Sequence, residues 1–250
     1  EEIPCFALTS PVAGSDASSI VDDGVVCRGT IDGKETLGIR LNWDKRYITL
    51  APVATLIGLA FKLYDPDHLL GDKEEIGITC ALIPVATAGV VTGRRHFPLC
   101  SAFPNGPTQG NDVFISVDSI IGGTKMAGHG WRMLMESLAA GRSISLPSMA
   151  VGGTKREVFA CGAYARIRKQ FNVHIGVFGG VQEALARVGA YSFLMEATRL
   201  FTITALDRGE KSAVASAISK CHTTEMSRVV INNAMDIHGG KAICLGPHNY

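Results

Sequence analysis

The 250-residue sequence has few charged side chains and almost no net charge. Charged residues make up 19% of the chain, below the roughly 25% of an average globular protein. Twenty-four Lys and Arg residues oppose 23 Asp and Glu residues. A chain with this balance has no long-range field that would gather a nucleic acid or an acidic partner. The hydrophobic content of 46% in turn excludes a disordered chain.

Long apolar runs and paired cysteines are also missing. No run of about 18 or more consecutive apolar residues is present, so we expect no transmembrane helix. The seven cysteines are odd in number and scattered, without a Cys-x-x-Cys pair, which disfavours a disulfide framework and a zinc site. Reduced thiols indicate a cytosol-like compartment.

The common short motifs of nucleotide-binding and hydrolytic sites are absent as well. The sequence contains no Gly-x-x-x-x-Gly-Lys-Ser/Thr, no Gly-x-Gly-x-x-Gly, no His-Glu-x-x-His and no Gly-x-Ser-x-Gly. His222 and Glu225 lie one helical turn apart, but a metal site in a helical bundle needs matching carboxylates on other helices. We therefore expect no metal site.

The two halves of the chain carry different periodicities. Residues 37–41 alternate between apolar and polar side chains, as a half-buried strand does, and Asp32-Gly33 just upstream predicts a two-residue hairpin turn. Residues 76–83 and 113–117 predict further strands.

The second half has the helical period. A first helix should be interrupted by Pro147, a second should stop at Gly209, and a third should run from about Ser212 to Ile237. Strands followed by helices predict an α+β fold, or a β domain beside a helical bundle, with a boundary near residue 125.

Four short segments carry residue types suited to ligand binding. Residues 6–16 form a loop of small and hydroxylated residues, and residues 45–49 place an aromatic and a hydroxyl two positions apart. Residues 168–171 present Arg and Phe where a helix should break, and residues 236–240 end a helix with two glycines. Small residues let backbone N–H groups approach a ligand closely. Taken singly, each segment is more often a turn, a core strand, a solvated arginine or a helix cap.

The order of these segments resembles the acyl-CoA dehydrogenase family of flavoproteins. The family's Thr-Glu-Pro-x-x-Gly-Ser-Asp loop is similar to residues 9–16, in which Ser10 replaces Glu. Its Trp-Ile-Thr segment is similar to Tyr47-Ile48-Thr49, its Arg-x-x-Phe-Gly to residues 168–172 and its Ile-x-Gly-Gly to residues 237–240. The likeness covers essentially the whole chain.

The likeness is strongest to the long bacterial enzymes of fatty-acid β-oxidation, over residues 42–62 and 126–132. It implies a β-barrel-like middle domain of antiparallel strands at residues 1–125, followed by an incomplete α-helical bundle domain at residues 126–250. The family's N-terminal helical domain has no counterpart here. The chain starts without Met and ends in a turn-like segment, so we expect an internal fragment of a cytoplasmic bacterial protein, with a peripheral position at the inner membrane left open.

The resemblance implies an FAD site in a homodimer or tetramer. The reduced flavin carries negative charge near N1 and the C2 carbonyl, which requires pre-placed hydrogen-bond donors. The residues that match flavin contacts in the first half are Phe6, Ala7, Leu8, Thr9, Tyr47, Ile48 and Thr49. Ser15 matches a serine near the FAD phosphates and the pantetheine arm of the substrate. The matches expected at the FAD of a neighbouring subunit are Arg168, Phe171, Asp236, Ile237, His238, Gly239 and Gly240.

Three cofactor positions depart from the family pattern. Tyr47 replaces Trp, Asn172 replaces the Gly of Arg-x-x-Phe-Gly, and Gly179 stands where many members have a Gln that contacts FAD. These departures affect the expected affinity for FAD and leave its identity unchanged.

The expected base is missing from this chain. Removal of the α-proton of a thioester requires a positioned carboxylate. Some branches carry it immediately before an Arg that Arg142 matches, but here Gly141 precedes Arg142, and Glu136 would point elsewhere on its helix. We therefore expect Arg142 to lie on the substrate side, the base to follow Tyr250, and no catalytic residue in this chain.

The resemblance implies oxidation of a saturated, medium- to long-chain acyl-CoA to the trans-2-enoyl-CoA, with electrons passing to an electron-transfer flavoprotein or a similar acceptor. The fragment alone should be inactive. Two alternatives stay open: an acyl-CoA oxidase on the same fold, and a non-catalytic homologue that binds flavin or acyl-CoA.

Overall fold

The computed structural model describes residues 1–210 and 213–247, and the chain divides into two compact units, residues 1–134 and 135–250. Each unit is described by itself. The boundary expected near residue 125 lies inside the first unit, because helix α1 (Gly130–Ser143) begins against the β-strands. A Cβ on Gly130 would lie 2.8 Å from the carbonyl oxygen of Ile78, so only a glycine lets the helix start this close to the sheet.

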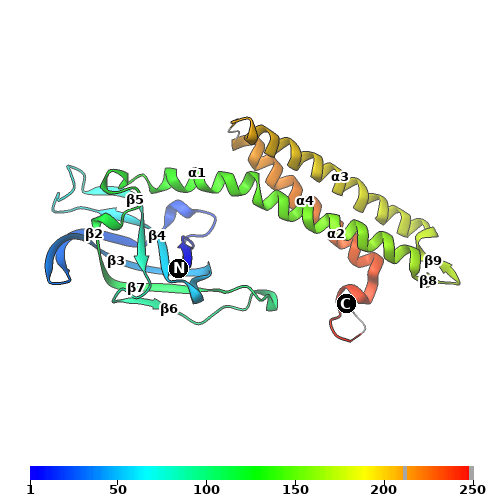
Figure 1. The fold of residues 1–250 in the computed structure, drawn as a ribbon, viewed down its shortest axis with the longest axis horizontal. Coiled ribbons are helices and arrows are strands. Elements are labelled where there is room, and N and C mark those ends of the chain that lie inside the picture. The colour runs from blue at the N-terminus through cyan, green and yellow to red at the C-terminus, as the bar shows by residue number, and fades with distance from the viewer. Residues whose placement is uncertain (211–212, 248–250) are drawn as a thin grey trace. The chain divides into compact units, whose positions relative to one another are not determined.

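One curled sheet forms the first unit (Figure 1). Its strands are β1 (Pro4–Ala7), β2 (Asp23–Ile31), β3 (Lys34–Thr49), β4 (Leu56–Tyr64), β5 (Glu75–Pro84), β6 (Val90–Thr92) and β7 (Asn105–Ser116). Their order is β1-β4-β2-β3-β7-β6, with β5 also paired to β4. The expected antiparallel pairing is present in β2–β3, β3–β7, β4–β5 and β6–β7, whereas β4 pairs in parallel with β1 and β2.

The turn between β2 and β3 confirms the predicted hairpin. Asp32 and Gly33 have φ values of 51° and 76°, and they connect strands paired from Asp23 with Asn42 to Ile31 with Lys34. Two positive φ values are those of a type I′ turn, whose twist matches the twist of the flanking strands.

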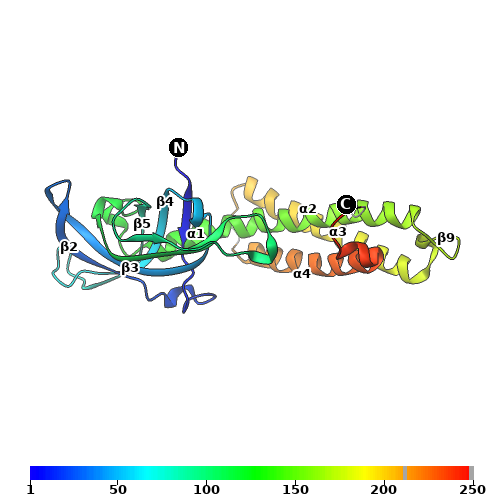
Figure 2. The same cartoon turned by 90° about the horizontal axis from the view of Figure 1, so that it is seen from below.

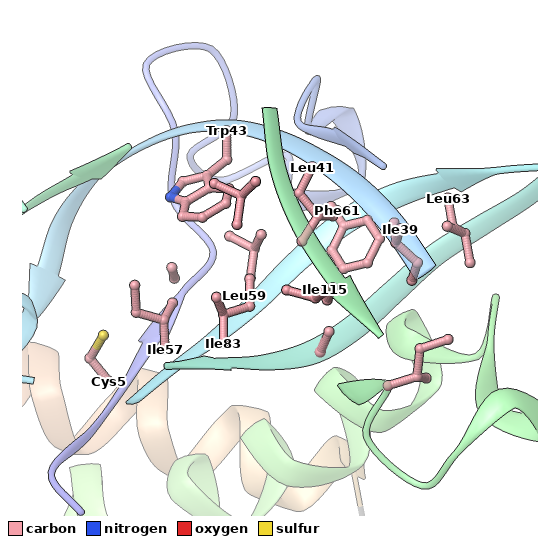
Figure 3. Close-up of a cluster of buried hydrophobic side chains, with 14 of the residues drawn as sticks. Cys5, Ile39, Leu41, Trp43, Ile57, Leu59, Phe61, Leu63, Ile83 and Ile115 are labelled. Atoms are coloured by element: carbon pink, nitrogen blue, oxygen red, sulfur yellow. The ribbon is translucent and has the colours of Figure 1, made fainter. Parts of the chain in front are cut away.

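The core of the first unit is an apolar cluster formed mainly by β3, β4, β5 and β7 (Figure 3). Its members include Ile39, Leu41, Trp43, Ile57, Leu59, Phe61, Leu63, Ile83 and Ile115. Along β3, every second residue from Ile39 to Trp43 points into this cluster, as the alternating pattern predicts. The next residue in the buried register is Lys45, whose side chain is fully buried.

Long helices form the second unit (Figures 1 and 2). They are α2 (Ser145–Ile167), α3 (Gly179–Asp207) and α4 (Ala213–His238), and each packs against the other two. The predicted interruption is confirmed: α1 ends at Ser143 and Pro147 lies in the first turn of α2, where its missing N–H costs no hydrogen bond. The predicted stop at Gly209 is confirmed by its φ of 82°.

A short hairpin separates α2 from α3. Its strands are β8 (Lys169–Gln170) and β9 (Val173–His174). The interior between the three helices mixes apolar side chains with small polar ones, and the buried polar side chains include Thr154, Ser192, Thr202, Ser219, Thr223 and Ser227. Several large apolar side chains of α3 point outward instead, and Phe193 and Phe201 are 80% and 72% exposed.

A cluster of three charged side chains links α2 to α3, and its contribution to stability should be lost in acid. Glu196 accepts hydrogen bonds from Arg199 Nε at 2.8 Å and from Lys155 Nζ, on α2, at 2.8 Å. The hydrogen bonds from Arg199 and Lys155 lower the pKa of Glu196 to about 2. A carboxyl whose pKa is lower in the folded state stabilises the fold above its unfolded pKa of roughly 4.3, and this contribution is lost as the pH falls toward 2.

We therefore expect Glu196→Gln to flatten the loss of stability between about pH 5 and pH 2. The measurement is the denaturant midpoint of each variant at several pH values in that range. The matched control is Glu225→Gln, which breaks an exposed pair with Arg228 on α4 and should leave the acid slope unchanged. Equal slopes for the wild type and Glu196→Gln would contradict the prediction.

Candidate functional site

The loop that follows β1 is tied down by two adjacent residues of β3. Lys45 Nζ donates to the carbonyl oxygen of Leu8 at 2.9 Å, and the backbone N–H of Arg46 donates to the carbonyl oxygen of Thr9 at 3.0 Å. The guanidinium of Arg46 adds a third contact, from Nη2 to the carbonyl oxygen of Pro11 at 3.1 Å. The predicted segments 6–16 and 45–49 are therefore adjacent in the first unit.

A compact turn forms the first half of the loop, and the second half of the loop is exposed. Ser10 and Ala13 exchange hydrogen bonds of 3.0 Å and are buried, whereas Gly14 and Ser15 are exposed. Asp16 accepts hydrogen bonds from the hydroxyls of Ser18 and Ser19, which lower the pKa of its carboxyl. A Cβ on Gly14 would meet no atom within 4 Å, so the backbone there is open to a ligand.

A β-bulge, and not simple alternation, presents the aromatic at Tyr47. The register of β3 with β7 shifts between Lys45 and Ile48, and Tyr47 has a φ of 60°. Tyr47 is 58% exposed, with its ring centroid 5.2 Å from that of His96. Ile48 is buried in the core, and Thr49 is exposed at the end of the strand.

The predicted flavin contacts of the first unit thus lie on neighbouring segments with different exposure. Phe6 is 43% exposed while Ala7 is fully buried, as expected for alternate residues of β1. Leu8 and Thr9 are half-buried at the start of the loop. In this part of the described chain, Arg46 Nε is buried and has no hydrogen-bond partner, which leaves one donor unused beside the loop.

Sequence reasoning missed a buried ion pair behind this loop. Lys45 Nζ contacts the carboxylate of Asp22, and their side chains are 0% and 1% exposed. Asp22 also accepts a hydrogen bond from the backbone N–H of Asp44 at 3.0 Å. The available signal was the position of Lys45 in the apolar register of β3, because a lysine there requires a buried acid as its partner.

In the second unit, Arg168 caps the C-terminal end of α2, and Phe171 lies in the turn of the β8–β9 hairpin that follows. Phe171 and Asn172 occupy its turn with φ values of 52° and 63°, and Asn tolerates the left-handed conformation that the family's Gly would adopt. Phe171 is 89% exposed, with its ring edge-on to Phe178. Within the described residues, no hydrogen bond or ion pair engages the guanidinium of Arg168.

The end of α4 lies beside the end of α2, one turn before Arg168. The ring of His238 stacks on Tyr164 with centroids 4.6 Å apart, and His238 Nδ1 donates to the carbonyl oxygen of Ala234 at 2.8 Å. Ile237 is buried, whereas Asp236, Gly239 and Gly240 are exposed. The structure therefore brings both predicted segments of the second unit to one end of its helices.

Two of the remaining candidates lie on α1 and one lies at the start of α3. Arg142 and Glu136 are exposed on α1, and Gly179 begins α3 with open space where a side chain would be. Burial raises the pKa of the Cys80 and Cys161 thiols to about 11, so both stay neutral and are poor nucleophiles. Within residues 1–210 and 213–247, no three metal-ligating side chains gather and no helix is long and apolar enough to cross a membrane.

The chain matches known proteins across both units. Residues 128–248 match the family model described as acyl-CoA dehydrogenase, C-terminal domain. A structure of an acyl-CoA dehydrogenase from Geobacillus kaustophilus aligns with a TM-score of 0.83 and 24% identity, covering 99% of this chain and 61% of that one. Residues 128–248 therefore belong to the acyl-CoA dehydrogenase family, as its C-terminal domain. The α+β fold of the chain, a curled sheet followed by helices, is the fold of that family's structures.

Other proteins similar to this chain have varied names. The 3-(aryl)acrylate reductase of Clostridium sporogenes is 29% identical over 96% of this chain and 59% of its own length. A protein named HemX from Proteus mirabilis is 62% identical over 42% of this chain and 61% of its own length. PigA, solved as a complex with FAD, is 27% identical with a TM-score of 0.79, covering 97% of this chain and 59% of PigA. This chain thus spans about three fifths of the length of these relatives.

Proposed function

We propose that this chain is the flavin-binding portion of an FAD-dependent acyl-CoA dehydrogenase. The observation that carries the proposal is the loop at residues 8–16, which two residues of β3 hold beside the exposed Tyr47 and Thr49. The FAD complex of PigA supports the choice of cofactor. FAD would supply the acceptor for a hydride from the acyl chain.

The residues present fit such a group. Thr9 would offer its N–H and hydroxyl to the pyrimidine edge of the flavin. Tyr47, Thr49 and the backbone of Ile48, whose side chain is buried in the core, would line the ring system near N5. The open backbone at Gly14 and the exposed hydroxyl of Ser15 suit a phosphate or the pantetheine arm of the substrate. Phe6 to Leu8 would provide the adjoining backbone.

The second unit would serve the FAD of a neighbouring subunit. The free guanidinium of Arg168 can grip a pyrophosphate with two parallel hydrogen bonds, and Phe171 offers an exposed ring beside it. The backbone from Asp236 through Ile237 and His238 to Gly239 and Gly240 would approach the same cofactor. A homodimer or tetramer follows, and the exposed Phe193 and Phe201 of α3 agree with a buried contact in such an assembly.

The proposal extends to the substrate, the electron acceptor and the cellular location of the protein. We propose a saturated, medium- to long-chain acyl-CoA as substrate, the trans-2-enoyl-CoA as product and an electron-transfer flavoprotein as acceptor, in the cytoplasm. Arg142 would lie on the substrate side, and the carboxylate base would come from beyond Tyr250, which leaves these 250 residues inactive alone.

The test is an anaerobic titration of the protein, purified as its gene encodes it, with palmitoyl-CoA while the visible flavin absorption is followed. Bleaching of the flavin is expected. A flavin that bleaches and is then rapidly reoxidised by O₂ would identify an oxidase. Bound FAD that stays oxidised would favour the non-catalytic homologue or another substrate class, and the absence of bound FAD would contradict the proposal.

A further inference from the structure

The Lys45–Asp22 pair has no evident reason to exist for stability alone. Moving two charges into the interior costs several kcal/mol each, and replacing a buried pair by apolar residues is often neutral or stabilising. Lys45 occupies a position of β3 where Ile39, Leu41 and Trp43 set an apolar pattern. An apolar side chain at position 45, with an apolar partner at position 22, would follow this pattern, so the buried charge calls for an explanation in geometry.

The pair is fixed in place by both neighbouring strands. Asp22 accepts from the backbone N–H of Asp44, and its own carbonyl oxygen accepts from the backbone N–H of Lys62 at 2.9 Å. The ammonium of Lys45 donates to the Asp22 carboxylate and to the carbonyl oxygen of Leu8. Because the ammonium is buried and anchored, the Leu8 carbonyl that accepts its hydrogen bond is held in a single orientation.

That direction determines where the next amide points. The peptide group is planar and trans, so the N–H of Thr9 points to the side opposite the carbonyl of Leu8. Arg46 holds the following carbonyl, that of Thr9, in the same way through its backbone N–H. The donor of Thr9 is thereby aimed away from Lys45 before any ligand arrives, and pre-aimed donors stabilise developing charge without reorganisation.

Asp22 also opposes the loss of the charge on the ammonium. Burial lowers the pKa of Lys45, and the hydrogen bond and negative charge of Asp22 act against this shift. A charged donor makes a stronger hydrogen bond to a carbonyl than a neutral one.

We propose that the buried Lys45–Asp22 pair is a positioning device that fixes the Leu8–Thr9 peptide so that the Thr9 N–H faces the pyrimidine edge of the flavin. Lys45 is thus a positioning residue, acting through the backbone of Leu8. This inference rests on the proposed function, because it names what the loop is aimed at.

The test compares three variants of the whole protein: Lys45→Met, Asp22→Asn and the double variant Lys45→Met/Asp22→Asn. Two quantities are measured for each, the denaturant midpoint of the apoprotein and the dissociation constant of FAD. Lys45→Met alone leaves a carboxylate buried without its cation and should lower the midpoint most. The double variant removes both charges at similar volume and should recover most of that loss.

The double variant should nevertheless bind FAD about three- to tenfold more weakly, since one hydrogen bond that orders the loop is gone. Asp22→Asn keeps the Lys45 donor and should bind FAD more tightly than the double variant. The matched control is Arg40→Met/Asp112→Asn, an exposed pair between β3, the strand of Lys45, and β7, which should leave FAD affinity unchanged. Recovery of both stability and wild-type FAD affinity in the double variant would overturn the positioning role.

A second measurement keeps the idea testable if the double variant does not fold. In the wild type, hydrogen exchange at the Thr9 amide should slow when FAD binds, because the cofactor would accept that hydrogen. An unchanged exchange rate with FAD bound would overturn the inference while leaving the proposed function intact. A wild-type protein without affinity for FAD would instead overturn the proposed function.

Discussion

Arg168→Lys should weaken FAD binding about 10- to 100-fold while leaving the fold unchanged. A charge-assisted hydrogen bond contributes roughly 1.5–3 kcal/mol, and lysine keeps the charge of Arg168 but loses the planar pair of donors that a pyrophosphate accepts. The fold should tolerate the change because the backbone alone anchors this residue: its N–H donates to Tyr164 and its carbonyl accepts from Ile175. Exposed substitutions of this kind usually change stability by less than about 0.5 kcal/mol.

The measurement is the dissociation constant of FAD, taken together with the thermal midpoint of the apoprotein. Arg156→Lys is the matched control, because Arg156 is an exposed arginine of α2 on which the structure places no function. Similar FAD affinities for wild type, Arg168→Lys and Arg156→Lys would remove Arg168 from the proposed site. A lower thermal midpoint for Arg168→Lys alone would show that its side chain supports the hairpin.

Local signals predicted the elements of this fold well, for physical reasons that are visible in single residues. Asp32-Gly33 adopts a type I′ turn because both positions have positive φ, which Asp and Gly tolerate. Pro147 marks the break before α2 because it cannot continue a helix from the preceding turn. Such signals depend on neighbours in the sequence, so no knowledge of tertiary contacts is needed to read them.

The missed features depend on contacts between distant residues. Asp22 and Lys45 are 23 positions apart and meet only because β2 folds back along β3. The bulge at Tyr47 likewise arises from the register with β7 and leaves no local mark in the sequence. Close approach of Gly130 to the backbone of β5 similarly moves the start of α1 into the first unit. A pattern of apolar residues cannot report such pairings.

The candidate site shows the same division. Family likeness proposes which residues serve the cofactor, and the structure adds how the loop after β1 is held: by Lys45 and Arg46 through three backbone carbonyls. This support is invisible in the motif, because its partners are carbonyl groups that every residue carries. The two most exposed aromatic rings of the proposed site, Tyr47 and Phe171, both have positive φ, so their presentation depends on backbone geometry more than on residue type.

At Gly240, a role in binding the cofactor can be separated clearly from a role in folding. A Cβ at this position would meet no atom of the described chain within 4 Å, and its φ lies outside the left-handed region. Gly240→Ala should therefore leave the free energy of unfolding unchanged or raise it by about 0.4–1 kcal/mol, because alanine lowers the entropy of the unfolded chain. Gly239 differs, because its φ of 61° would strain an alanine.

If the backbone at Gly240 approaches FAD, the added methyl group should clash with the cofactor. Overpacking of this kind costs about 1–3 kcal/mol, which corresponds to roughly 5- to 150-fold weaker FAD binding. The measurement pairs the FAD dissociation constant with the denaturation midpoint for Gly240→Ala, with Gly153→Ala on α2 as a control that also has open space at its Cβ. Wild-type FAD affinity in Gly240→Ala would show that the cofactor does not approach this segment, whereas weaker binding at unchanged stability can only come from a group outside the folded chain.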